Sequence, residues 1–353
     1  MERVPAAFAP VAYIPGLFYE ALVRMRGSLY SRGIIRRHRL PGPVISIGNL
    51  TMGGTGKTPL VIYTARTLAK LGFEPAVLTR GYGRDEPNRM HIVSPGEYIH
   101  SPAAVLGDEP AVIRRHLPAI LLGISKNRYL AGKEIWKRHP GVVFVLDDGF
   151  QHLKLQRDLD IVLVDRSRPP ASDRLIPLGT LREPLAGLCR CDVVIVNDMP
   201  HFKKADAVAT QIRELHPGGI VFQSRQEIAS LVPIDSWKKG EPAKTPQPAV
   251  RTAYLVSAVG NPERFRRDIE RTGIRVTGAT SFADHHRIGP KEWQGCIVEA
   301  MNKNAEVMIM TEKDAVKIDN PPAFPLLVAV QDTVISDPGK FEQILRESIE
   351  ARL

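Results

Sequence analysis

Residues 44–59 read VISIGNLTMGGTGKTP and combine a short apolar strand, a glycine-rich loop and the first turn of a helix. Glycines let several backbone N–H groups converge on one anion, and the positive end of the following helix points to the same place. Lys57 would supply a charge for the outer phosphates, and Thr58 a hydroxyl for Mg²⁺. The stretch predicts a phosphate-binding loop made of Thr51, Met52, Gly53, Gly54, Thr55, Gly56, Lys57 and Thr58.

The loop departs from the P-loop pattern GxxxxGK[ST] at one place, because Thr51 stands at the position of the first glycine. A chance glycine-rich turn is the alternative interpretation. The flanking segments argue against it, since an apolar strand precedes the loop and an amphipathic helix follows. That helix carries Leu60, Val61, Thr64 and Leu68 on one face. We therefore expect the loop to bind a nucleoside triphosphate.

The composition is that of an ordinary globular protein, and 353 residues are enough for two domains. The three cysteines, Cys189, Cys191 and Cys296, have no CxxC spacing. This argues against a disulfide framework or a zinc ribbon and favours the reducing cytosol. The formal net charge of +10 indicates an acidic partner, which would be nucleic acid, an anionic membrane surface or a phosphorylated substrate.

Half of this excess charge lies in residues 1–40, which hold seven arginines and two glutamates. Apolar residues between Ile14 and Leu29 fall on one helical stripe. The pattern predicts a basic amphipathic helix, which either lies on an anionic bilayer or packs on the protein. The longest uncharged run, Val4–Tyr19, contains three prolines and predicts neither a membrane span nor a signal peptide. We expect a cytosolic chain.

Apolar runs alternate with helical segments after the loop, which is the pattern of a parallel, doubly wound α/β sheet that binds ligands at the carboxyl ends of its strands. The runs lie in the segments 75–84, 119–124, 142–152, 161–165 and 193–198.

The pattern breaks at residues 231–250, and a second, smaller α/β/α set follows. Its strands are expected in 253–262, 282–286, 307–317 and 326–330, before a C-terminal helix from about residue 337. We predict an N-terminal helical segment (1–40), a P-loop domain (41–200), a connecting region (201–250) and a second domain (251–353) that contributes to the cleft.

The segment VVFVLDD, residues 142–148, has the form of a Walker B strand, in which a carboxylate follows an apolar strand. Asp147 or Asp148 would hold Mg²⁺ opposite Thr58, directly or through water. Aspartate at a strand end is a weak signal alone, but it becomes a strong one together with the P-loop upstream.

Residues 107–110 read GDEP, and the pattern alone favours Asp108 as the N-cap of the next helix, with Pro110 in its first turn. The alternative is that Asp108 accepts a proton from a substrate hydroxyl.

His285 and His286 follow Asp284 and would point to opposite faces of a strand. This makes a metal site less plausible than an Asp–His pair that helps to orient a base.

Seven segments occur in the order found in the tetraacyldisaccharide 4′-kinases of Gram-negative bacteria, and the chain resembles that family from residue 48 to residue 317. They are GNLTMGGTGKTP, LTRGYGR, GDEP, DDGFQH, LGTLREP, FADHH and TEKDAVK. The family commonly has a small hydroxyl residue where Thr51 stands, and a basic, membrane-associated N-terminal helix. LGTLREP differs from the more usual AGPLREP, which keeps Arg182 but leaves the adjacent turn open.

The resemblance implies transfer of the γ-phosphate of ATP to the 4′-hydroxyl of an acylated disaccharide 1-phosphate lipid, forming lipid IVA in lipid A biosynthesis. It implies Mg²⁺ as cofactor and a peripheral position at the cytoplasmic face of the inner membrane. It suggests no nucleic-acid partner and no obligate protein partner. Since His285 and Lys57 lie in different predicted domains, domain closure is expected to assemble the site.

The resemblance also implies roles for individual residues. Asp108 would be the base and His285 its partner. The implied catalytic residues are Asp108, His285, Lys57 and Asp148, and the implied Mg²⁺ ligands are Thr58, Asp147, Asp148 and Glu109. Tyr82, Arg128, Gln151, His152 and Arg182 lie in matching segments and are expected at the nucleotide or the substrate.

A membrane-associated partitioning ATPase is the alternative function, because that class also combines a GGxGKT loop with an amphipathic helix. It requires a lysine where Met52 stands. A GTPase would need an NKxD or TKxD tetrad, which neither VIVND nor TEKD matches. In a non-enzymatic P-loop adaptor, the carboxylates and histidine further along the chain would have no use.

Overall fold

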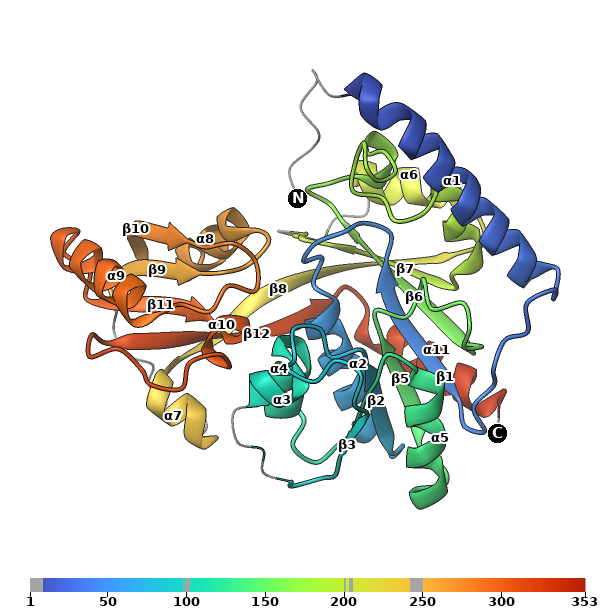
Figure 1. The fold of residues 1–353 in the computed structure, drawn as a ribbon, viewed down its shortest axis with the longest axis horizontal. Helices are drawn as coiled ribbons and strands as arrows, with labels where there is room; N and C mark the ends of the chain where they lie inside the picture. Colours follow the sequence, from blue (N-terminus) through green and yellow to red (C-terminus); the bar gives the residue numbers. More distant parts are fainter. Residues whose placement is uncertain are drawn as a thin grey trace.

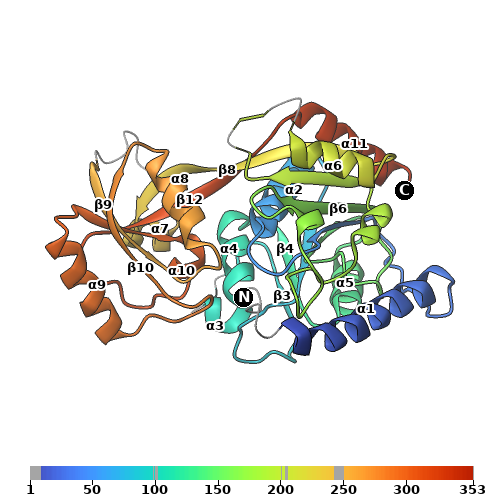
Figure 2. The ribbon, with the colours of Figure 1, turned by 90° about the horizontal axis from the view of Figure 1, so that it is seen from above.

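The computed structural model describes residues 9–97, 99, 102–199, 201–202, 206–241 and 250–352. The predicted N-terminal segment and connecting region therefore lie partly outside the described residues, at 1–8, 203–205 and 242–249. The described strands form one twelve-stranded sheet in the order β10-β9-β11-β12-β8-β7-β6-β1-β5-β2-β4-β3. Helices cover the sheet (Figures 1 and 2), and the predicted α/β fold is confirmed.

The half of the sheet that contains the P-loop consists mainly of parallel strands. These are β1 (Val44–Asn49), β2 (Pro75–Thr79), β4 (Leu121–Ile124), β5 (Val143–Asp147), β6 (Leu159–Asp165) and β7 (Val193–Asn197), with β3 (His91–Val93) antiparallel at the edge. Continuous apolar runs bury both faces of these strands, as a covered parallel sheet requires. Because β1 lies between β5 and β6, the P-loop leaves the sheet near the middle of this half.

Helices pack on both faces of this half. α2 (Lys57–Lys70), α4 (Asp108–His116) and α11 (Pro338–Glu350) share an apolar cluster with Ile45 and Ile161, while α5 (Arg128–Arg138) and α6 (Ala207–Leu215) pack on the alternate residues Val44 and Val162. The predicted apolar face of α2 is confirmed, since all four of its residues are buried. α3 (Pro102–Leu106) precedes α4, and short 3₁₀ turns occur at Pro170–Ser172 and Leu185–Arg190.

The other half contains β9 (Thr252–Ser257), β10 (Arg275–Ser281), β11 (Val307–Thr311) and β12 (Leu326–Ile335), with α8 (Pro262–Glu270), α9 (Pro290–Asn302) and α10 (Glu312–Ala315). β8 (Ile220–Pro233) pairs with β7 at its start and antiparallel with β12 along the rest, which joins the halves (Figure 1). α7 (Ile234–Lys239) follows β8. β8 thus occupies part of the expected connecting region, and the domain limits stay a prediction.

Residues 282–286 do not form the strand that the sequence predicts. The strand is β10, which ends at Ser281, and the predicted residues form the loop after it. β10 is an edge strand whose residues are mostly exposed or half-buried, so it lacks the apolar run that marks the other strands. An edge strand of this kind is hard to predict from the sequence, because only part of its surface is buried and it needs few apolar residues.

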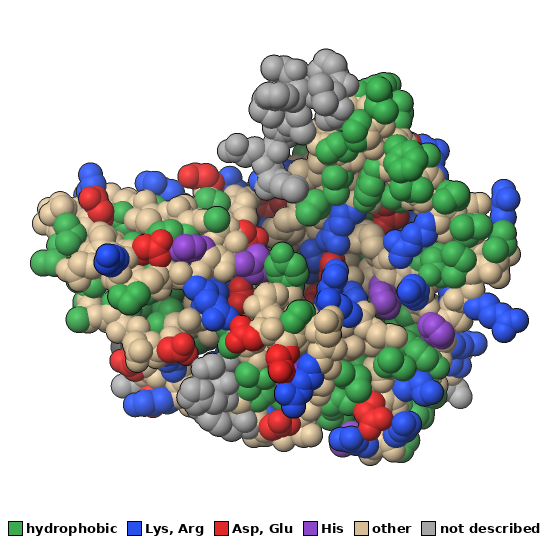
Figure 3. Space-filling view, in the orientation of Figure 1, with side chains coloured by type: hydrophobic (Ala, Val, Ile, Leu, Met, Phe, Trp, Pro, Cys, Tyr) green, Lys and Arg blue, Asp and Glu red, His purple; other side chains and the backbone are tan. Residues whose placement is uncertain are grey.

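The N-terminal helix α1 (Ala9–Ser31) lies along the outside of the P-loop half (Figures 1 and 2). Its predicted stripe faces solvent, with Ile14, Leu17 and Phe18 between 52% and 75% exposed. Figure 3 shows hydrophobic side chains along this edge of the molecule. Tyr19 and Tyr30 face the protein, so the helix packs on it by one side and leaves the stripe free. None of the described helices combines the length and apolar character of a membrane span.

Replacing Phe341 by alanine should lower the free energy of unfolding by about 3–5 kcal/mol. Phe341 of α11 is fully buried, and its ring centroid lies 5.7 Å from that of Phe222 on β8 and 5.9 Å from that of Tyr63 on α2. Truncation leaves a cavity where the last helix meets the P-loop helix. Denaturant titration measures the loss, with the exposed Lys340→Ala as control. A loss below about 0.5 kcal/mol, the size typical of surface substitutions, would contradict this packing.

Candidate active site

A cavity of about 600 Å³ lies at the carboxyl ends of β1, β2 and β5 and extends to the second half of the sheet. Figure 3 shows charged and histidine side chains close together in this central region. The predicted site residues that line the cavity are Met52, Gly53, Gly54, Thr55, Gly56, Lys57, Thr58, Tyr82, Glu109, Asp147, Asp148, Arg182 and His285.

The side chain of Asn49, the last residue of β1, bonds to two residues of the P-loop and holds them in place. Its Nδ2 donates to the carbonyl oxygen of Thr51 (2.8 Å) and to Oγ1 of Thr55 (2.9 Å). Gly56 ends the loop with φ +91°, and a Cβ there would lie 2.5 Å from Nδ2 of Asn197, so only glycine fits. α2 begins at the next residue, which directs the N-terminus of a 14-residue helix at the cavity.

Two cations hold Asp148. Arg182 donates to both carboxylate oxygens at 2.9 Å each, and Nζ of Lys57 lies 3.5 Å away. Burial raises the pKa of Asp148, but Lys57 and Arg182 outweigh burial and keep that pKa below its usual range. Nζ of Lys57 also donates to Oδ1 of Asn49 (3.2 Å). Asp148 is thus the ionised partner of both Lys57 and Arg182.

Asp147 lies among negative charges. Its Oδ2 accepts from Oγ1 of Thr79 (2.9 Å). Burial, together with the charges of Glu109 and Asp148, raises its pKa to about 7. A cation beside Asp147 would relieve this repulsion, and oxygen ligands from carboxylates and the Thr58 hydroxyl suit Mg²⁺.

No three His, Cys, Asp or Glu side chains among the described residues form a metal site by themselves. Mg²⁺ at nucleotide sites takes much of its coordination from phosphates and water. Thr58, Asp147 and Glu109 line the same cavity as the P-loop, so their oxygens fit a metal bound in that way.

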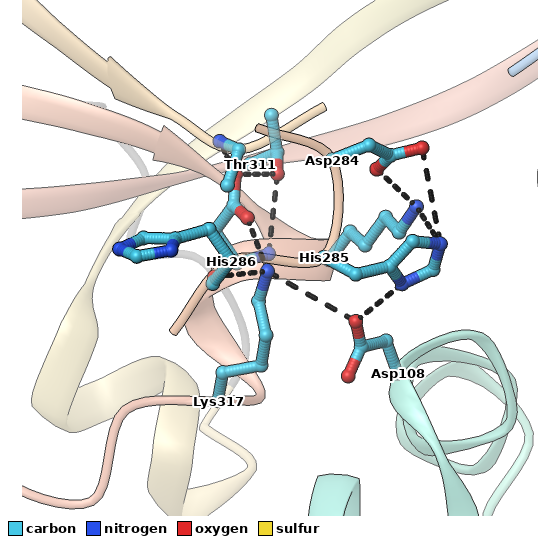
Figure 4. A network of polar contacts seen from close by, with 9 residues as sticks. Asp108, Asp284, His285, His286, Thr311 and Lys317 are labelled. Carbon is cyan, nitrogen blue, oxygen red and sulfur yellow. Dashed lines mark hydrogen bonds and ion pairs between the residues drawn. The ribbon is translucent and has the colours of Figure 1, made fainter. Parts of the chain in front are cut away.

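Asp108 and His285 come from opposite halves of the sheet and meet beside the cavity (Figure 4). Nδ1 of His285 lies 2.9 Å from Oδ2 of Asp108, which is 4% exposed. The N-cap of α4 is Gly107, where φ is +97° and a Cβ would lie 2.4 Å from the carbonyl oxygen of Tyr82. The N-cap interpretation of Asp108 is therefore wrong, because its carboxylate makes a tertiary contact in place of a local one.

The two adjacent histidines turn to different neighbours (Figure 4). Nε2 of His286 lies 2.9 Å from Glu292, and its ring stacks on Phe282 with centroids 5.1 Å apart. The ring of Tyr82 packs on His285 at 5.1 Å. The two side chains therefore point to different neighbours, although both residues lie in a loop and not in the predicted strand.

Other expected residues lie behind the cavity wall. Gln151 donates through Nε2 to the carbonyl oxygen of Asn49 (2.9 Å) and to Glu183 (2.7 Å). Arg128 is buried, and its charge attracts that of Asp148. Gln151 thus bonds to Asn49, the residue at which β1 ends before the P-loop. The expected residues that do not line the cavity are Thr51, Asp108, Arg128, Gln151 and His152.

Sequence reasoning missed several residues that shape the site. Asn49 and Asn197 are the last residues of parallel strands. Ligands often bind at such strand ends, so both residues could have been predicted from their positions. The buried side chains of Gln226, Arg264 and Asp268 line the cavity, and each has a polar atom without a hydrogen-bond partner in the described structure. They belong to segments without a motif, so no local pattern marks them.

Three comparisons identify similar proteins. A family model described as tetraacyldisaccharide-1-P 4′-kinase matches residues 8–350. The tetraacyldisaccharide 4′-kinase of Syntrophus aciditrophicus is 36% identical over 325 residues, covering 90% of this chain and 86% of the relative. That of Geobacter sulfurreducens is 38% identical over 339 residues, covering 95% and 92%. A crystal structure of LpxK from Aquifex aeolicus in complex with ATP is similar with a TM-score of 0.76 and 28% identity, over 98% of this chain and 99% of that one.

Replacing His152 by glutamine should make the protein less sensitive to acid. Burial, with the positive charges of Arg128 and Arg157, lowers the pKa of His152 to about 3, against about 6.5 in an unfolded chain. The unfolded state therefore binds more protons in this window, and stability falls as the pH falls from about 6.5 towards about 3.

Denaturant titration should show that the wild type loses about 1 kcal/mol more than His152→Gln between about pH 7.5 and about pH 5.5. The control is His201→Gln, which removes an exposed histidine. Equal losses in wild type and His152→Gln would show that the buried imidazole does not control this pH dependence.

Proposed function

Because the chain belongs to the tetraacyldisaccharide 4′-kinase family, we propose that it transfers the γ-phosphate of ATP to the 4′-hydroxyl of an acylated disaccharide 1-phosphate. The product is lipid IVA of lipid A biosynthesis. The observation that carries this proposal is one cavity lined by both the P-loop and His285, the hydrogen-bond partner of Asp108.

In the proposed reaction, the oxygen of the 4′-hydroxyl bonds to the γ-phosphorus while the bond from that phosphorus to the β–γ bridging oxygen breaks and ADP leaves. Asp108 takes the hydroxyl proton, and His285 holds the carboxylate in place. Lys57 and Arg182 lie where negative charge is redistributed over the phosphate oxygens. The chemistry is mainly positioning and charge neutralisation, so no covalent intermediate with the protein is required.

Thr58, Asp147 and Glu109 are the proposed ligands of Mg²⁺, which supplies charge neutralisation on the phosphates when bound. Asp148 is proposed to reach the metal through water, because its own oxygens bond to Arg182 in this structure. Of the two neighbouring aspartates, Asp147 is then the direct metal ligand, and Asp148 pairs mainly with Arg182 and Lys57.

The cavity has room for a nucleoside beyond the P-loop. Gln226, Arg264 and Asp268 line it, and each has a buried polar atom without a hydrogen-bond partner in the described structure, although Oδ2 of Asp268 lies 3.8 Å from Nε of Arg264 as an ion pair. Ile62 and Phe265 add apolar lining to the same cavity. Buried polar atoms are rarely left unpaired, so a nucleoside with hydrogen-bonding groups on an apolar ring suits this lining.

Helix α1 connects the site to a membrane surface in this proposal. The hydroxyl of Tyr19 donates to the backbone oxygen of Arg182 (2.8 Å), and Arg26 donates to that of Gln151 (3.1 Å). The exposed apolar stripe of α1 therefore has a fixed position beside the cavity. We infer that α1 binds the cytoplasmic face of the inner membrane, so that the acyl chains stay in lipid while the sugar enters the cavity.

Lys57→Ala and Asp108→Asn should each lower transfer of labelled phosphate from ATP to tetraacyldisaccharide 1-phosphate in micelles by about 10²–10⁴-fold. The first variant loses a phosphate cation and the second a proton acceptor. Lys70→Ala is the control, because this exposed lysine ends the same helix α2. Thermal unfolding checks that the variants are folded.

Near-normal transfer by either variant would exclude the proposed site. Wild-type protein that hydrolyses ATP and leaves the lipid unlabelled would instead favour an ATPase of the partitioning type.

Replacing Leu17 and Phe18 together by serine should weaken binding to vesicles that contain phosphatidylglycerol by at least about tenfold. Burial of each apolar side chain is worth about 1.5–3 kcal/mol. Cosedimentation measures the bound fraction. Val298→Ser, which removes an exposed apolar side chain from α9, should bind like the wild type. Unchanged binding of the double variant would contradict a membrane role for the stripe.

A further inference from the structure

A lysine that the proposed reaction does not use touches His285. Nζ of Lys313, on α10, lies 3.2 Å from Nε2 of His285 and 2.8 Å from Oδ1 of Asp284. Figure 4 shows the imidazole between the carboxylates of Asp284 and Asp108. Nδ1 of the ring therefore faces the carboxylate of Asp108, whereas the group nearest to Nε2 is the ammonium of Lys313, with Asp284 further away at 3.8 Å.

The positions of the hydrogens follow from these contacts. An ammonium group has donors and no acceptor, so Lys313 can bond to Nε2 of His285 only if this nitrogen carries a lone pair. The imidazole is then neutral and carries its proton on Nδ1. Nδ1 lies 2.9 Å from Oδ2 of Asp108, and in this tautomer it donates a hydrogen bond to that oxygen.

We propose that Lys313 is a positioning residue that fixes the Nδ1–H tautomer of His285 and thereby holds Asp108 ready to accept a proton. The proposal rests on the proposed function, in which Asp108 takes the proton of the acceptor hydroxyl. His285 occupies Oδ2 of Asp108, which leaves Oδ1 for that hydroxyl.

Removal of the ammonium group would change which nitrogen holds the proton. Oδ2 of Asp284 lies 3.8 Å from Nε2 of His285, and without Lys313 this carboxylate would favour a proton there. Nδ1 would then present a lone pair to Asp108, and two acceptors repel each other. A second proton on the ring would instead place a positive charge beside Asp108 and make its carboxylate a poorer base.

The surroundings fix the ring in this orientation. His285 has φ +68°, a conformation that residues other than glycine seldom adopt, and Tyr82 packs against the ring. The side chain of Lys317, which is 4% exposed, bonds to Asp314 (2.7 Å) and to the carbonyl oxygen of His286 (3.1 Å). Its Nζ lies 4.0 Å from Oδ2 of Asp108 (Figure 4). The segment that follows β11 thus supplies a cation on each side of the Asp–His pair.

Nitrogen-15 NMR of the ring tests the tautomer directly, in the full chain labelled at its ten histidines. The signals of His285 are assigned by their loss in His285→Asn. In the wild type they should be those of a neutral ring with its proton on Nδ1. In Lys313→Met the proton should move to Nε2, or both nitrogens should carry one. Lys313→Arg should keep the wild-type pattern, because guanidinium also only donates.

Lys291→Met is the matched control, since it removes an exposed lysine from the same half of the sheet. Unchanged signals of the other histidines show that the variants are folded. A proton on Nε2 in the wild type, or an unchanged tautomer in Lys313→Met, would overturn the proposal.

Kinetics supply a second readout. Lys313→Met should lower kcat for phosphate transfer by about tenfold or more, the scale on which outer partners that orient a histidine act, without raising either KM. Lys313→Arg should restore most of this loss, and Lys291→Met should behave like the wild type. A raised KM for ATP with unchanged kcat would assign Lys313 to phosphate binding and overturn the proposal.

The two readouts also separate the two proposals. A wild type that leaves the lipid unlabelled would refute the proposed function, while the ring signals would still decide the tautomer.

Discussion

The hydrogen bond between Asp108 and His285 joins side chains 177 residues apart, and the site depends on the two halves of the sheet being held together there. Helix α4, which begins with Asp108, also contacts the second half of the sheet at its other end. There Nε2 of His116 lies 2.9 Å from both carboxylate oxygens of Glu312. All of these groups except His285 are nearly buried. Charges buried alone are costly, but pairing them fixes the position of α4 between the halves.

The adjacent aspartates after β5 show how neighbours decide the chemistry of a side chain. Asp148 faces Lys57 and Arg182, and its pKa falls, whereas burial and the charge of Glu109 raise the pKa of Asp147. The same residue type therefore pairs with two cations at one position and lies among other negative charges at the next. A further cation at Asp147 would relieve the repulsion among these carboxylates.

Local signals made much of this structure predictable. The P-loop, its helix and the buried parallel strands each carry a pattern within a few residues. β8 was missed because it changes partner from β7 to β12 along its length, so its burial follows no single period. Its residue Gln226 was missed with it.

The role of Asp108 shows the limit of local reasoning. Capping preference describes only neighbouring residues, whereas the side chain that Asp108 contacts, His285, lies on the opposite half of the sheet. The family resemblance supplied that pairing. It did not supply Lys313 or Asn49, whose contacts become visible only when strand ends and loops are placed in space.

The bond from Tyr19 to the backbone of Arg182 sets how far the apolar stripe of α1 lies from the cavity. On the proposed membrane assignment, the lipid acceptor reaches the protein by lateral diffusion within the bilayer, while ATP arrives from the aqueous phase. Turnover then follows the mole fraction of acceptor in the surface and not its amount per volume. Inert lipid added at a constant amount of acceptor would slow the enzyme by dilution in two dimensions.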